Sequence, residues 1–228
     1  MSYVLSYLYG SIPFSYIVGK VFRGVDVSEE GSGNVGASNV GIVTGSRVLF
    51  LLALALDMSK GILPSVLWGP VAGAMGVVGH VFSVFLFVFK FRFRRVRSGL
   101  GMAATLGWLL VNAWKMIPIV LGLFALFYMV MNPMDWRREW LHRWYAIEEG
   151  NIETVFAVGA GSVAYLLLFS PNEEVKTAVF IILLTVFYAY ARVIRSQLAE
   201  FWDWKKSEKY LENLKGGKGA DQGRRTRR

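Results

Sequence analysis

The chain has 228 residues, of which 54% are hydrophobic and only 18% are charged, whereas a soluble globular domain carries about 25% charged residues. This shortage of charge argues against a soluble enzyme and against a disordered chain. Cysteine is absent and histidine occurs only twice, which excludes disulfides, thiolate metal sites and a cysteine nucleophile, and disfavours a histidine-rich metal site. The net charge of +9 suits nucleic acid or anionic lipid, and the long apolar runs favour lipid.

Apolar windows of about the 20 residues that a membrane-spanning helix needs recur along the chain. In chain order we predict seven spans, over residues 3–22, 47–68, 69–89, 99–113, 115–131, 154–170 and 175–194. The predicted fold is therefore all-α, a polytopic membrane bundle, because no alternating pattern indicates a barrel. We predict a transmembrane domain over residues 1–195. A cytoplasmic tail over 196–228 is expected to begin helical and end basic and disordered.

The charge pattern predicts the orientation of the spans. The basic run KFRFRRVR at 90–97, the pair Lys20 and Arg23, and the basic tail all fall on one side of a seven-span chain. Basic loops are typical of the cytoplasmic side, so we expect the N-terminus outside, the C-terminus inside and a multi-pass protein of the cell membrane. The first window lacks the basic start of a cleaved signal peptide. The tail either contacts anionic lipid or is a solvated extension.

Three tryptophans, Trp136, Trp140 and Trp144, recur every four residues between the fifth and sixth windows. This spacing places three indoles on one helical face. We interpret the segment as a short helix at the membrane interface, in preference to a substrate-binding aromatic box.

A glycine-rich segment, GSGNVGASN at residues 31–39, follows the first predicted span. Such a turn can aim consecutive backbone N–H groups at a phosphate. The side chains of Ser32, Asn34, Ser38 and Asn39 supply further hydrogen-bonding groups. Glycine spacing alone leaves a second interpretation equally open, namely a sharp turn that packs against other helices.

Other candidate residues lie in or near the predicted spans. Asp57 and Lys60 are three residues apart and can pair on a helix, either as a structural ion pair or as a substrate or metal contact. His80 follows Gly79 in the third span and is either a helix–helix hydrogen-bonding group or a catalytic residue. Arg97 begins the sequence RSGLG at the entry to the fourth span, where it can meet an anion or simply start a helix.

These motifs, in this order, resemble those of the bacterial acyl-phosphate:glycerol-3-phosphate acyltransferases, small membrane enzymes of about seven spans. The resemblance covers roughly the first 105 residues, through GSIPFSYIVGKVF (10–22), GSGNVGASN (31–39), LDMSKGILP (56–64) and GHVFSVFLF (79–87). It implies transfer of an acyl group from acyl phosphate to glycerol 3-phosphate, or to a related polyol phosphate, giving lysophosphatidic acid for phospholipid synthesis. It implies no cofactor, no bound metal and no nucleic-acid partner.

The resemblance also implies site residues. Phosphate binding is expected from Ser32, Gly33, Asn34, Gly36 and Ser38, and catalytic roles are expected for Ser38, Asn39, His80 and Ser162. We also expect Arg97 to bind phosphate, because it lies near a position where the family has lysine. Asp57 and Lys60 match the family's intramembrane acid and base. Ser38 stands where the family has threonine.

At least two family cations are absent from this chain. Ile42 stands where the family has arginine, and Leu100 stands where it has lysine. In one hypothesis nearby arginines replace these cations. In the other, the chain is a catalytically impaired or substrate-shifted relative that binds a phospholipid or acyl phosphate. A small anion transporter is a third hypothesis, disfavoured because no inverted repeat is visible.

Overall fold

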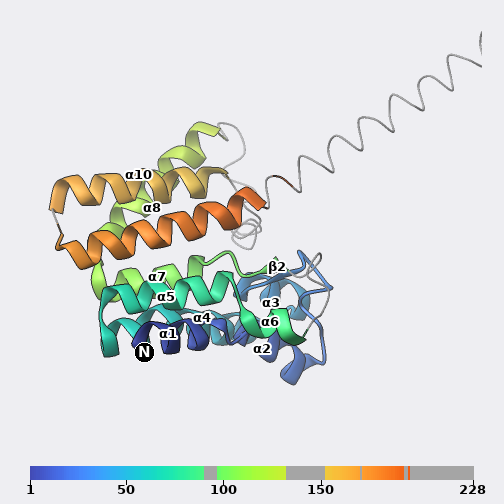
Figure 1. Ribbon diagram of the computed structural model, residues 1–228. Coiled ribbons are helices and arrows are strands. Elements are labelled where there is room, and N and C mark those ends of the chain that lie inside the picture. The colour runs from blue at the N-terminus through green and yellow to red at the C-terminus, as the bar shows by residue number, and fades with distance from the viewer. Residues whose placement is uncertain (90–96, 132–151, 170, 193–194, 196–228) are drawn as a thin grey trace, which may run out of the picture. The chain divides into compact units, whose positions relative to one another are not determined.

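A computed structural model describes residues 1–89, 97–131, 152–169, 171–192 and 195 (Figure 1). The chain divides into two units, Met1–Tyr190 and Ala191–Arg228, and the elements that follow belong almost entirely to the first. The predicted interfacial tryptophans, the basic run over 90–96 and the predicted tail over 196–228 lie outside the described residues. The predicted domain boundary at residue 195 therefore stays a prediction.

The described part of the chain is a succession of helices with one two-residue strand pair. Its elements are α1 Ser2–Ser11, α2 Phe14–Arg23, β1 Asn34–Val35, α3 Ala37–Thr44, α4 Arg47–Trp68, α5 Pro70–Val81, α6 Val84–Phe89, β2 Arg97–Ser98, α7 Met102–Asn112, α8 Met116–Met131 and α10 Ile152–Phe169. A further helix, Glu173–Arg192, follows α10.

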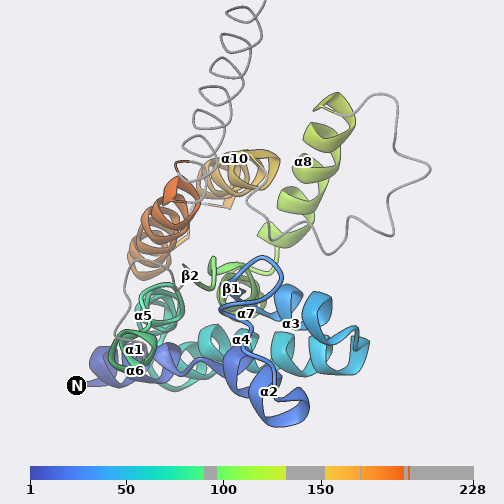
Figure 2. The same cartoon turned by 90° about the vertical axis from the view of Figure 1, so that its right-hand side faces the viewer.

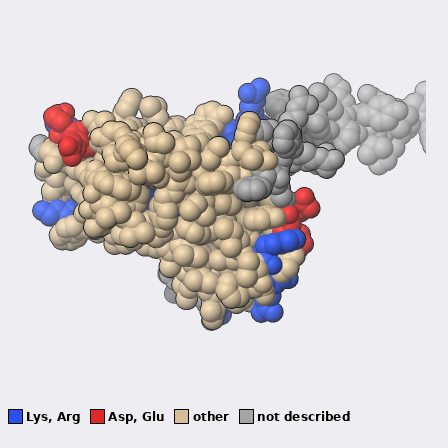
Figure 3. Space-filling model, turned by 60° about the horizontal axis from the view of Figure 1, so that its bottom comes forward, with Lys and Arg blue, Asp and Glu red and all other residues tan. Residues whose placement is uncertain are grey.

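Three described stretches are long and apolar enough to cross a membrane: α4, the combined stretch Pro70–Val88 and the helix Glu173–Arg192. The apolar stretches Met102–Asn112 and Val158–Phe169 are shorter. Large hydrophobic side chains are exposed along these helices, including Leu51, Leu167 and Phe187. Figure 3 shows a surface that is mostly uncharged, with basic and acidic side chains gathered in a few places. The predicted helical membrane fold is confirmed, whereas the count of seven spans stays a prediction.

The expectation of one continuous helix over residues 3–22 is wrong. Helix α1 ends at Ser11 and α2 begins at Phe14. Pro13 has no backbone N–H and disfavours helical geometry in the residue before it, and Ile12 is accordingly extended. The window 69–89 is likewise interrupted, between α5 and α6 at Phe82 and Ser83.

Glycines allow α1, α4, α5 and α7 to pack closely. A Cβ on Gly76 of α5 would overlap the backbone carbonyl of Lys60 in α4, and a Cβ on Gly10 of α1 would overlap that of Gly76. A Cβ on Gly61 would overlap the carbonyl of Ala104 in α7. Small residues at such crossings let backbones approach closely, as membrane helix packing requires.

The glycine-rich segment sits on a small apolar core. Val18 of α2, Val35 of β1 and Val40 of α3 are buried in one cluster with Ala53 of α4. Strand β1 pairs in parallel with β2, with Asn34 opposite Arg97 and Val35 opposite Ser98, and Figure 2 shows this pair beside α7. This strand pair, which the sequence did not predict, joins two segments that were both expected on the cytoplasmic side.

Candidate active site

Asn39 organises the glycine-rich segment from inside. Its Nδ2 lies 2.6 Å from the carbonyl oxygen of Val27 and 3.0 Å from those of Glu30 and Asn34, all of which accept hydrogen bonds from it. Its Oδ1 accepts a hydrogen bond of 2.9 Å from the N–H of Ser32. Asn39 is 1% exposed. Its carboxamide is thus engaged within the loop, and its predicted catalytic role stays a prediction.

Gly31 makes this inward arrangement possible. Its φ is +62°, a left-handed conformation that glycine adopts without steric cost, and a Cβ there would overlap Asn39 Oδ1. Gly33 and Gly36 donate their N–H groups to the carbonyls of Glu30 and Asn34, each at 3.0 Å. Several N–H groups of the segment therefore bond within the loop and do not face a ligand. The first turn of α3 suits an anion better, because N–H groups at a helix start lack intrahelical partners and carry the positive end of the helix dipole.

Asn34 stands next to that turn with an unused side chain. It lies in β1, is 5% exposed, and neither its Oδ1 nor its Nδ2 has a hydrogen-bond partner among the described residues. A buried polar group without a partner costs free energy, so such a group points to a ligand. Helix α3 begins at Ala37, and its second residue is the buried Ser38. The predicted phosphate-binding residues Asn34, Gly36 and Ser38 are therefore close together in the chain and in space.

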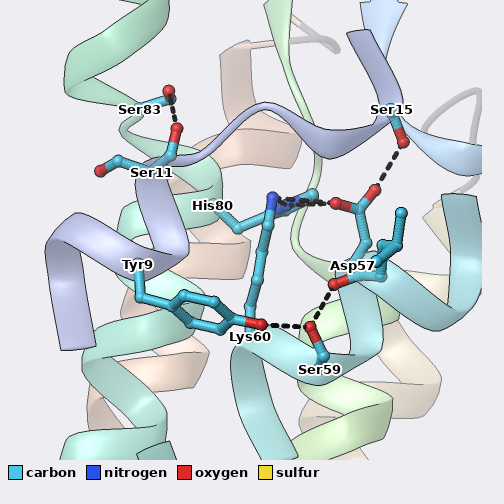
Figure 4. A network of polar contacts seen from close by, with 9 residues as sticks. Tyr9, Ser11, Ser15, Asp57, Ser59, Lys60, His80 and Ser83 are labelled. Carbon is cyan, nitrogen blue, oxygen red and sulfur yellow. Dashed lines mark hydrogen bonds and ion pairs between the residues drawn. The ribbon is translucent and has the colours of Figure 1, made fainter. Parts of the chain in front are cut away.

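The predicted ion pair forms and gains two partners. Lys60 Nζ lies 2.8 Å from Asp57 Oδ1 and 2.8 Å from His80 Nδ1. Ser15, at the start of α2, donates a 2.6 Å hydrogen bond to Asp57 Oδ2. All four side chains are buried, and Figure 4 shows them converging from α2, α4 and α5. This group, the Ser15–Asp57–Lys60–His80 network, is held by three elements at the break between α1 and α2.

The network also lies close to the strand pair. Ser98 of β2 donates a hydrogen bond from Oγ to the carbonyl of Val81, the residue after His80. A Cβ on Gly99 would overlap His80 Nε2. His80 and Arg97 are separate candidates in the sequence, and in the structure the residues next to Arg97 contact His80 and Val81.

The remaining predicted residues are Ser162, the two positions where the family has cations, and Arg97. Ser162 is buried in α10, and its Oγ donates a 2.7 Å hydrogen bond to Val158 within the same helix. Ile42 is 42% exposed on α3, whereas Leu100 is 7% exposed. Only the backbone of Arg97 is described, through its pairing with Asn34.

Two residues of the site, Ser15 and Gly99, are not predicted from the sequence. Ser15 lies two residues after Pro13, where the helix is broken. A hydroxyl at such a break is a signal in the sequence for a polar contact. Gly99 has no such signal in the sequence, and only its contact with the His80 ring in the structure shows that it belongs to the site. Among the described residues, no group of three or more His, Cys, Asp or Glu side chains is placed to hold a metal ion.

Comparison with known proteins decides the family. The family model described as glycerol-3-phosphate acyltransferase matches residues 1–200. The chain belongs to this family. A glycerol-3-phosphate acyltransferase of Geobacillus kaustophilus is 30% identical over 196 residues, covering 82% of this chain and 86% of that protein.

Other relatives match over shorter stretches. The glycerol-3-phosphate acyltransferase of Desulfotalea psychrophila is 38% identical over 135 residues, covering 54% of this chain and 64% of its own length. Glycerol-3-phosphate acyltransferase 2 of Moorella thermoacetica is 39% identical over 121 residues, covering 50% of this chain and 58% of its own length. The chain thus spans less than two thirds of these two relatives.

The fold is also that of a solved structure. The crystal structure of PlsY, an integral membrane glycerol 3-phosphate acyltransferase in its glycerol 3-phosphate form, superposes with a TM-score of 0.64 at 22% identity. The match covers 87% of this chain and 91% of that one. The helical membrane architecture expected from the sequence is therefore shared with a family member.

Proposed function

We propose that this protein transfers an acyl group from acyl phosphate to the 1-hydroxyl of glycerol 3-phosphate. Family membership supports the reaction class. The observation that carries the proposal is the buried carboxamide of Asn34, which has no partner among the described residues. Asn34 lies in β1, three residues before the start of α3. A phosphate oxygen there would accept from Nδ2 and meet the positive end of the helix.

The proposed reaction needs little chemistry from the protein. The hydroxyl oxygen bonds to the acyl carbon, the bond from that carbon to the phosphate oxygen breaks, and the hydroxyl proton ends on the inorganic phosphate that leaves. Acyl phosphate is already activated, so positioning and charge stabilisation supply most of the acceleration. No residue has to form a covalent intermediate, which suits a chain without cysteine.

Purified protein in lipid bilayers tests the proposal directly. Glycerol 3-phosphate and acyl phosphate are supplied, and lysophosphatidic acid is the expected product. Acyl coenzyme A in place of acyl phosphate is the donor control. Absence of product from a protein that melts cooperatively would reject the proposed activity.

A second candidate function is binding of a phospholipid or acyl phosphate without turnover. It is favoured by Ile42 and Leu100, which stand where the family resemblance implies cations. A charge-assisted hydrogen bond contributes about 1.5–3 kcal/mol, so two uncompensated losses would slow the reaction by about two to four orders of magnitude at ~1.4 kcal/mol per tenfold. Ligand binding without product would favour this function.

The topology that goes with the proposal is seven spans in the cell membrane, with the N-terminus outside, the C-terminus inside and the basic tail near anionic lipid. The chain has no cysteine, so single cysteines map it cleanly. Glu29→Cys, after α2, should react only with reagents on the cytoplasmic side. Glu173→Cys should react only from outside, and labelling of both from one side would reject the arrangement.

A further inference from the structure

Strand β2 is attached to the end of α5 by two adjacent contacts. Ser98 Oγ donates to the carbonyl of Val81, and Gly99 lies so close to His80 that a Cβ on it would overlap the ring nitrogen Nε2. Because β2 pairs with β1, this attachment also supports the strand that carries Asn34. The His80 ring is therefore the surface on which Gly99 and strand β2 pack. We call this packing surface the seat of Gly99.

The opposite edge of that ring is fixed by charge. His80 Nδ1 lies 2.8 Å from Lys60 Nζ, and Lys60 Nζ lies 2.8 Å from Asp57 Oδ1. Ser15 holds the other carboxylate oxygen of Asp57. Lys60 and Asp57 are each 1% exposed and His80 is 6% exposed, so water does not replace these bonds.

The geometry assigns the proton of His80. A lysine ammonium carries three donors and no acceptor, so the ring nitrogen facing it must accept. The rival arrangement, in which Nδ1–H donates to Asp57 Oδ1, has a separation of 3.5 Å, beyond the usual 2.7–3.2 Å of such bonds. The ring proton is thus on Nε2, the side of Gly99, and that nitrogen has no lone pair with which to remove a proton from a substrate.

We propose that Asp57, Lys60 and His80 are positioning residues, which lock the His80 ring in its Nε2–H form as a seat for Gly99 and thereby hold the β1–β2 pair in place. His80 is then not a general base. This inference rests on the proposed function for its effect on the reaction, because the strand pair would then position Asn34 beside a substrate phosphate. The arrangement of the ring and its proton is independent of any activity.

Nitrogen-15 NMR of histidine tests the proton assignment. The chain has two histidines, so a His142→Gln variant, labelled with 15N-histidine and held in lipid bilayers near neutral pH, reports His80 alone. The expected spectrum shows a neutral ring protonated at Nε2. In Lys60→Met, which keeps an unbranched side chain without the ammonium, that preference should be lost. A ring protonated at Nδ1 in the parent, or an unchanged spectrum in Lys60→Met, overturns the inference.

Gly99→Ala tests the seat without removing any side chain of the Ser15–Asp57–Lys60–His80 network. Gly99 is not among the glycines of positive φ, so its backbone accepts alanine, and the added Cβ meets the His80 ring. We expect the KM for glycerol 3-phosphate or for acyl phosphate to rise about tenfold or more, with a smaller change in kcat, as for lost binding geometry. Measuring both substrates shows which phosphate the strand pair positions. Gly122→Ala in α8, where a Cβ meets nothing within 4 Å, is the matched control.

A double-substitution cycle shows whether Gly99→Ala acts through the His80 ring or through a general loss of structure. In a His80→Ala background the ring is gone, so Gly99→Ala should add little further change in KM, since coupled residues act non-additively. Unchanged KM values for both substrates in Gly99→Ala, or fully additive effects in the cycle, would overturn the positioning role. A parent protein without turnover would refute the proposed function instead, and the NMR spectrum would then decide the inference by itself.

Discussion

The side-chain oxygen of Asn39 accepts a hydrogen bond from the backbone N–H of Ser32, seven residues earlier, at 2.9 Å. Together with the three carbonyls that its Nδ2 reaches, this bond makes Asn39 the internal support of the glycine-rich segment. The substitution Asn39→Ala leaves these buried groups unpaired, and each such group costs about 1–3 kcal/mol. We expect a loss of at least ~2 kcal/mol of stability, measured as a lower melting temperature in detergent. If the variant melted like the parent, the glycine-rich segment would not depend on the hydrogen bonds of Asn39.

Asn34→Ala should behave in the opposite way. Its carboxamide has no partner among the described residues, so its removal should leave the melting temperature nearly unchanged. One hydrogen bond to a charged ligand is worth about 1.5–3 kcal/mol, so the KM for the bound phosphate should rise roughly 10- to 150-fold. Steady-state kinetics with each substrate varied in turn checks this.

Asn112→Ala is the matched control for Asn34→Ala. The Nδ2 of Asn112 donates to Ser65 Oγ at 2.8 Å and to the carbonyl of Trp108 at 3.0 Å. We expect a lower melting temperature without a change in KM. If the two asparagine variants gave the same pattern, Asn34 would be structural and not a ligand group.

The buried pair of Asp57 and Lys60 should show strong coupling in stability. Asp57→Asn alone leaves the ammonium of Lys60 buried without its counter-charge, which costs about 3–5 kcal/mol. The double variant Asp57→Leu with Lys60→Met removes both charges, and replacing a buried pair by apolar residues is often neutral. Thermal melting should therefore place the double variant above Asp57→Asn. A double variant that melts lower still would contradict the pairing.

The substitutions Ile42→Arg and Leu100→Lys should differ in how much stability they cost the protein. Ile42 is 42% exposed, so arginine there should leave stability nearly unchanged. Leu100 is 7% exposed, and an unpaired buried lysine should lower the melting temperature unless a phosphate ligand pairs with it. Stabilisation of Leu100→Lys by added glycerol 3-phosphate, beyond that of the parent, would place position 100 beside the anion. A gain in turnover in the combined variant would favour the second candidate function.

Close helix packing gives a prediction that does not depend on activity. A Cβ on Gly76 would overlap the carbonyl of Lys60, whereas a Cβ on Gly122 meets nothing within 4 Å. Overpacking costs about 1–3 kcal/mol or more, so Gly76→Ala should melt well below the parent and Gly122→Ala should not. Equal melting of both variants would mean that α4 and α5 are not in close contact at this position.

Local signals explain which elements were predictable. Residues 47–68 were predicted as a span, and α4 is Arg47–Trp68. Ser46 caps its start by accepting from the N–H of Leu49, and the Gly69–Pro70 pair ends it. The predicted helix over 3–22 is wrong because Pro13 lies inside it, and proline lacks a backbone N–H and disfavours helical geometry in the residue before it.

The site was predictable only where its residues are neighbours in sequence. The contact of Asp57 with Lys60 follows from their spacing on one helix. The addition of His80 and Ser15 depends on how α5 and α2 pack against α4, which no local pattern specifies. The unpaired carboxamide of Asn34 is likewise invisible in the sequence, because it depends on which groups the described part of the fold places beside it.

The parallel pairing of Asn34 and Val35 with Arg97 and Ser98 has a consequence for biogenesis. During synthesis the first strand leaves the ribosome before α3, α4, α5 and α6, and its partner emerges only after all four. The nascent loop therefore waits without its second strand while the intervening hydrophobic helices enter the bilayer. Chains arrested before residue 97 should insert those helices and yet present an unfinished loop, open to proteases that the completed protein resists.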